Sequence, residues 1–117
     1  MNYEDMSDYE INKEVSKYWN EISKHLNLED TETTFNDENE TVYVIAENGV
    51  FEWLPVTYFD PCNNPNDAFH IIFENKISTS PTGDSWICGS SVFGTQTIDK
   101  NPLRAACICF LKMQSLK

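Results

Sequence analysis

The sequence has few basic residues and few glycines, and these shortages argue against two classes of function. Eight lysines and arginines stand against nineteen aspartates and glutamates, which gives a formal net charge of −11 over 117 residues. Nucleic-acid binding needs a basic surface, so we expect no direct contact with DNA or RNA. The four glycines lie in predicted turns or near strand ends, and none belongs to a glycine-rich phosphate-binding loop.

Long apolar runs are also missing. No stretch approaches the roughly 20 apolar residues that a membrane-spanning helix needs. The first five residues lack the basic start and apolar centre of a signal peptide. We therefore expect a cytoplasmic protein that makes no membrane contact. The length and the hydrophobic fraction of 40% suit a single domain over 1–117.

Histidine is scarce, and the cysteines show no motif. His25 and His70 lack metal-ligand spacing, and the cysteines at 62, 88, 107 and 109 contain no Cys-x-x-Cys pair. We expect reduced, structural thiols. A nucleophile–base pair would require Cys62 to meet His70, and nothing in the intervening turn and helix brings them together. The sequence thus predicts no catalytic residue, metal or cofactor, and favours a binding protein over an enzyme.

The helix signals are strong. Ser7 and Glu10 form a capping-box pattern before an apolar stripe, which predicts a helix over about 8–26. Asn64-Pro65 and Asn101-Pro102 each place an asparagine cap before a proline at the first helical position. These two starts predict helices over about 65–75 and 102–115.

The last helix carries an unbroken apolar run. Seven consecutive apolar residues fill positions 105–111. On a helix such a run covers every face, so we expect this helix at the centre of the core, with a sheet on one side and a helix on the other.

The remaining segments predict strands and loops. Asn48-Gly49 is a strong turn signal that predicts a hairpin over about 41–56. A second strand pair is predicted at 77–79 and 85–88 around a turn at 81–84, whereas 27–40 is interpreted as an acidic loop or linker and 89–100 as irregular. The order α-β-β-α-β-β-α predicts an α+β domain with a mainly antiparallel sheet packed with helices.

The negative charge is unevenly distributed. Residues 1–40 contain twelve acids and three lysines, a balance of −9, which leaves −2 for the other 77 residues. An acidic face of this kind favours solubility, and it also steers a protein towards a basic partner or imitates nucleic-acid phosphates. The candidate acidic contact surface consists of Glu29, Asp30, Glu32, Asp37 and Glu38.

The best candidate for a recognition surface is the turn from Asp60 to Asn64. It is rich in hydrogen-bonding groups and follows Tyr58 and Phe59. The candidate binding residues are Asp60, Cys62, Asn63, Asn64, Asp67, Trp86 and Arg104. Arg104 is interpreted either as a clasp on Asp60 or Asp67, or as an anion-binding group.

The roles of Asp60 and Asp67 each have two interpretations. Asp60 suits a turn before a proline, and Asp67 suits the first turn of a helix. The other reading is an acid–base pair or a metal site.

The chain resembles the NinX-like small phage proteins, which are encoded by tailed bacteriophages and prophages of enterobacteria. The resemblance rests on the blocks 7–12, 59–65 with Asp67-Ala68, Ile71-Ile72, Glu74-Asn75, Ile77-Ser78, Trp86, 101–106, Phe110-Leu111 and Met113-Gln114. The chain departs from the pattern at Phe69-His70, where the family has Trp-Pro, and in the acidic region 27–40.

The resemblance implies a phage accessory protein made in the host cytoplasm, and it supplies no catalytic residue. Two functions are consistent with it. One is stoichiometric binding that inhibits a host protein, such as a defence component, through the acidic surface. The alternative is a small-ligand or nucleotide binder that uses the Asp60–Asn64 turn as a sponge or degrader of an immune signal. A nucleic-acid enzyme is a third reading, and the oligomeric state is left open.

Overall fold

The computed structural model describes residues 2–26, 31–46 and 57–117. Its elements, in chain order, are η1 (Tyr3–Asp5), α1 (Asp8–Ser16), α2 (Trp19–Leu26), β1 (Thr31–Asn36), β2 (Thr41–Ala46), β3 (Thr57–Tyr58), α3 (Pro65–Glu74), β4 (Ser78–Thr82), β5 (Ser85–Ser90), β6 (Thr95–Asp99) and α4 (Pro102–Ser115). Sheet A has the order β1-β2-β3 and sheet B the order β4-β5-β6. All four strand pairings are antiparallel, which confirms the predicted α+β class.

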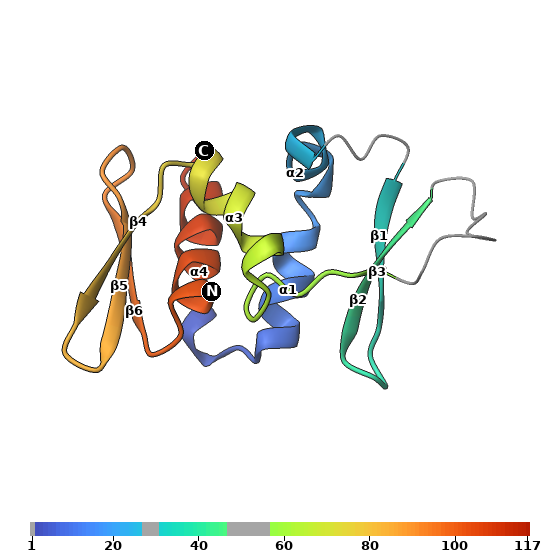
Figure 1. Cartoon of the computed structure of the whole chain (residues 1–117), viewed down its shortest axis with the longest axis horizontal. Coiled ribbons are helices and arrows are strands. Elements are labelled where there is room, and N and C mark those ends of the chain that lie inside the picture. Colours follow the sequence, from blue (N-terminus) through green and yellow to red (C-terminus); the bar gives the residue numbers. More distant parts are fainter. Residues whose placement is uncertain (1, 27–30, 47–56) are drawn as a thin grey trace.

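Helices separate the two sheets (Figure 1). Helix α4 contacts β5 and β6 on one side and α1 and α3 on the other. Sheet A rests on the far side of this helical layer, where α1 contacts β2 and α2 contacts β1. Each sheet therefore has one face towards helices, and the described part of the chain places no helix on the opposite face of either sheet.

Helix α4 is the centre of the core, as its apolar run predicts. Every residue from Ala105 to Leu111 is buried, and Met113 is buried as well. Phe110 packs edge-on against Tyr18 at a ring-centroid distance of 5.5 Å. Burying residues on all sides of one helix draws both halves of the chain onto it, since α1 comes from the N-terminal half and sheet B from the C-terminal half.

The predicted first helix is divided into two. The apolar stripe is correct, because Ile11, Val15 and Ile22 are buried. At the division, the Ser16 hydroxyl donates to the Lys13 carbonyl (2.7 Å). The backbone N–H groups of Lys17 and Tyr18 then donate to carbonyls three residues back instead of four. A serine that bonds back to its own helix competes with the regular ladder. The break turns Trp19 into the core, where its indole N–H donates to Thr31 Oγ1 (3.1 Å).

The interpretation of 27–40 as a loop is wrong for 31–36, which form strand β1. This strand pairs along its whole length with β2, from Thr31 opposite Ala46 to Asn36 opposite Thr41. The backbone groups of this polar strand form their hydrogen bonds with β2. Because β2 is a separate segment of the chain, the composition of 31–36 alone does not predict the pairing. Strand β2 lies within the predicted hairpin, whose turn at Asn48-Gly49 falls outside the described residues.

Sheet B contains the predicted hairpin and one strand more. The pair β4–β5 confirms the predicted turn region, with Thr82 opposite Ser85. The interpretation of 89–100 as irregular is wrong for 95–99, which form strand β6. This strand pairs with β5 along its whole length: Thr95 lies opposite Ser90, and Asp99 lies opposite Trp86. Gly94 has a φ of +69° in the connecting turn, a conformation that suits glycine. The alternation in β6 is weak in the sequence, since only Ile98 is strongly apolar.

Candidate functional site

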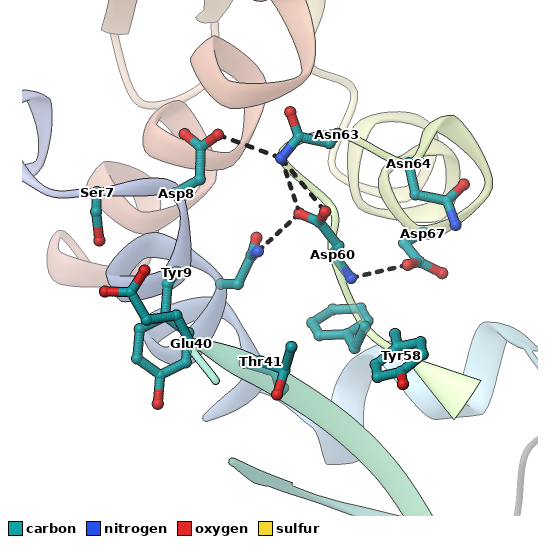
Figure 2. A pocket seen from close by; sticks show the side chains of 13 residues that line it. Ser7, Asp8, Tyr9, Glu40, Thr41, Tyr58, Asp60, Asn63, Asn64 and Asp67 are labelled. Carbon is teal, nitrogen blue, oxygen red and sulfur yellow. Dashed lines mark hydrogen bonds between the residues drawn. The ribbon is translucent and has the colours of Figure 1, made fainter. Parts of the chain in front are cut away.

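An open pocket lies between sheet A and the N-terminal ends of α1 and α3 (Figure 2). It has a volume of about 640 Å³. Its lining residues are Ser7, Asp8, Tyr9, Asn12, Glu40, Thr41, Val42, Tyr58, Phe59, Asp60, Asn63, Asn64 and Asp67. Four of these carry carboxylates and none carries a basic group. The predicted recognition turn therefore forms one wall of a real concavity.

Local sequence shapes that wall. The backbone N–H groups of Asn63 and Asn64 donate to the Asp60 carbonyl (3.1 and 2.8 Å) and close the turn around Pro61. The Asn64 side chain then accepts from the N–H of Asn66 (3.0 Å), which confirms Asn64 as the cap of α3. The turn and the cap fix where the polar side chains of this segment stand.

Asp60 is held by two amide side chains. Asn12 Nδ2 donates to it at 2.8 Å, and Asn63 Nδ2 lies 3.2 and 3.3 Å from its two oxygens. Asn12 is only 6% exposed, and its Oδ1 accepts from the N–H of Cys62 (3.2 Å). Asn12 thus bridges α1 to the turn across 48 residues of sequence. Sequence reasoning missed this role because an asparagine within a helix carries no signal of a partner 48 residues away.

Asp67 stands at the third position of α3 and accepts from the N–H of Asp60 (2.9 Å). Loss of solvent around its carboxylate raises the pKa of Asp67, the bond from the Asp60 N–H lowers it, and the negative charge of Asp60 raises it again. The balance is a carboxyl group that holds its proton more tightly than usual. Figure 2 shows Asp60 and Asp67 side by side at the pocket wall. A positive group placed there would relieve their repulsion.

Arg104 does not pair with Asp60 or Asp67, and that expectation is wrong. Its Nη1 donates to Asp8 (2.7 Å) and its Nε to Asp99 (3.2 Å). Its Nη2 donates to the carbonyls of Glu4 (3.2 Å) and Met6 (2.5 Å). The guanidinium is therefore a clasp between the N-terminal segment, β6 and α4. It does not line the pocket, although its partner Asp8 does.

The family comparison covers almost the whole chain. The profile described as "Bacteriophage P22, NinX" matches residues 2–114. The chain belongs to this NinX family of phage proteins. No curated protein and no solved structure gives a significant match. The family finding confirms the resemblance derived from the Asn-Pro blocks and agrees with a phage accessory protein.

In this member of the family the cysteines are core residues. Cys62, Cys88, Cys107 and Cys109 are all free and buried. Burial raises the pKa of Cys88 to about 11. A hydrogen bond with Cys62, together with burial, raises the pKa of Cys107. Cys62 belongs to the candidate turn, but its thiol faces the core and not the pocket.

Trp86 is a third predicted binding residue, after Arg104 and Cys62, that does not line the pocket. It is half-buried in β5, opposite Pro81 and Asp99. Sheet B lies on the opposite side of the helical layer from sheet A (Figure 1). Trp86 therefore does not share a site with the Asp60–Asn64 turn.

The acidic contact surface is described only in part. Glu29 and Asp30 fall outside the described residues. Glu32 is exposed on β1, and Asp37 and Glu38 are exposed in the turn that leads to β2. Asp37 is engaged within the protein, by the Tyr9 hydroxyl (2.5 Å) and by Lys13 (3.1 Å). Glu38 and the pocket residue Glu40 lie in the same turn, so the acidic surface and the pocket are continuous.

Within residues 2–26, 31–46 and 57–117, no group of three or more histidine, cysteine, aspartate or glutamate side chains is arranged to hold a metal ion. No helix there is both long and apolar enough to span a membrane.

Proposed function

We propose that this NinX-family protein acts by stoichiometric binding to a basic host protein, and that the acidic pocket with its adjoining β1–β2 turn provides the contact. The observation that carries the proposal is the composition of the pocket wall. Asp8, Glu40, Asp60 and Asp67 contribute carboxylates, and the lining contains no lysine or arginine.

Such a wall favours a cationic group of a partner. Two of its carboxylates, Asp8 and Asp60, are held in place by bonds to other side chains, so the negative field needs no rearrangement before contact. Among the described residues, no hydrogen bond or ion pair engages Glu40, which leaves it available to a partner. Concentrated charge of one sign also accelerates association with a partner of the opposite sign.

The nucleotide-binding alternative has less support. A phosphate in this pocket would face four carboxylates, and Arg104 is already engaged by Asp8 and Asp99. The polar groups of the Asp60–Asn64 turn also bond largely to one another and to α1. Inhibition of a host defence component is the form of the binding function that we favour, because the chain belongs to a family of phage proteins.

Affinity capture from infected host lysate tests the proposal, with the bound fraction analysed for protein and for nucleotide. We expect a host protein that copurifies at one copy per chain and is inhibited by it. Glu40→Lys should weaken the purified complex, and Asp84→Lys, in the distant turn between β4 and β5, should match it in charge without weakening it. Copurification of a nucleotide in place of a protein would contradict the proposal.

A further inference from the structure

The outward face of sheet A is built around two tyrosines. Strand register places Thr34, Tyr43 and Tyr58 in one row across the three strands. Glu32 and Ile45 form the next row. The alternate residues of β2, Val42 and Val44, are buried against the helices, so this row faces away from them. We call the surface formed by Glu32, Thr34, Tyr43, Ile45 and Tyr58 the tyrosine face.

The two rings form a fixed platform. Their centroids lie 5.4 Å apart at an interplanar angle of 41°. The Thr41 hydroxyl bonds to the Tyr43 hydroxyl (2.7 Å) and holds that ring. Tyr58 is 57% exposed, whereas the next residue, Phe59, is buried, because successive side chains of a strand point to opposite faces. An aromatic surface that is both exposed and positioned is a common anchor in protein interfaces.

The charge on the described part of this face is negative. Glu32 lies on the face itself, and none of its positions carries a basic residue. Lys13 lies over the ring of Phe35 at 4.1 Å and pairs with Asp37. Phe35 belongs to the alternate side of β1, so this lysine does not neutralise the tyrosine face. The face also continues into the acidic pocket, because Tyr58 belongs to both and Thr41, which bonds to Tyr43, lines the pocket.

We propose that the tyrosine face docks arginine side chains of the basic partner, an inference that rests on the proposed function and specifies its chemistry. A guanidinium is flat, stacks on a tyrosine ring and at the same time donates two parallel hydrogen bonds to a carboxylate. Tyr58 supplies the ring, and Glu40 and Asp67, which line the pocket together with Tyr58, supply carboxylates. Lysine offers the same charge but only a point contact, so this surface selects arginine over lysine.

Titration of the purified protein with oligoarginine and oligolysine peptides of equal length tests the inference without the host protein. At low salt we expect oligoarginine to bind roughly twofold to fivefold more tightly than oligolysine. The backbone amides of Tyr43, Ile45 and Tyr58 should show the largest chemical-shift changes. Tyr58→Leu should abolish the preference for arginine, while Tyr58→Phe, which keeps the ring, should retain it.

Phe69→Leu is the matched control. Phe69 is also 57% exposed, but it lies on α3 and stacks on Phe73. Its replacement should leave both peptide affinities unchanged. Unchanged amide spectra away from the substitutions establish that each variant is folded.

Three results of the peptide titration would overturn the inference. They are equal affinities for the two peptides, retention of the arginine preference in Tyr58→Leu, and chemical-shift changes confined to sheet B or α3. Self-association through the tyrosine face, seen as concentration-dependent shifts without peptide, would assign the face to a second copy and also refute it. None of these results depends on lysate capture, so the inference and the proposed function can fail separately.

Discussion

Each of the two sheets has three antiparallel strands in the described part of the chain, yet their outward faces differ in charge. The described positions of the tyrosine face of sheet A include Glu32 and two tyrosines and merge with the acidic pocket. The outward rows of sheet B are Ser80–Ile87–Ile98, Ser78–Gly89–Gln96 and Thr82–Ser85, and none of these residues is charged. If the acidic residues served solubility alone, both exposed faces would carry them. The difference agrees with the proposed contact at the sheet A end.

The link between the two ends gives the largest expected effect. Arg104 joins Asp99 of sheet B to Asp8 at the pocket, and its side chain is only 13% exposed. Replacing Arg104 by Met leaves these carboxylates without their cation, so we expect a loss of about 3 kcal/mol in unfolding free energy. Denaturant titration measures it. Lys112→Met, which removes the more exposed pair with Glu4, should cost about 1 kcal/mol or less. Equal losses would show that the clasp does not couple the two ends.

The two asparagine caps provide the next effect. Asn64 caps only α3, and Asn64→Ala should cost about 1 kcal/mol. Asn101 caps α4 and also donates to the Cys62 carbonyl (2.7 Å) in the pocket turn. Losing that donor leaves a carbonyl unpaired, so Asn101→Ala should cost about 2 kcal/mol. Denaturant midpoints measured on both variants test the order. A smaller loss for Asn101→Ala would contradict the second role.

These caps illustrate what the sequence reveals. Each cap, with its proline, is encoded within a few residues, and so is the apolar run of α4; all of them were predicted correctly. The pocket turn was predicted because Asp60 to Asp67 is contiguous. The structure contributes the partners that lie far away in sequence, such as Asn12 against Asp60 and Asp8 against Arg104. Strands β1 and β6 were missed for the same reason, since both depend on pairing and not on their own composition.

The smallest effect concerns alkaline pH at the sheet A end. Loss of solvent around the Tyr9 hydroxyl, together with its bond to Asp37, raises the pKa of Tyr9 to about 12 from an ordinary value of 10.0. The folded protein therefore favours the neutral hydroxyl. This contribution to stability is complete below about pH 10 and is lost as the pH rises towards about 12. Denaturant midpoints across this window should fall less steeply in Tyr9→Phe than in the wild type. Identical slopes would show that the Tyr9–Asp37 bond does not contribute to stability.

The most direct test of the central claim compares two sets of neutralised acids with equal charge and different positions. The sheet A set is Glu32→Gln, Glu38→Gln and Glu40→Gln, and the control set is Asp5→Asn, Glu21→Gln and Asp84→Asn; all six residues are exposed. The measured quantity is the rate constant for association with the captured host protein at low salt. We expect the sheet A set to slow association by about tenfold and the control set to change it little. Equal slowing by both sets would show that total charge, and not its placement at sheet A, governs binding.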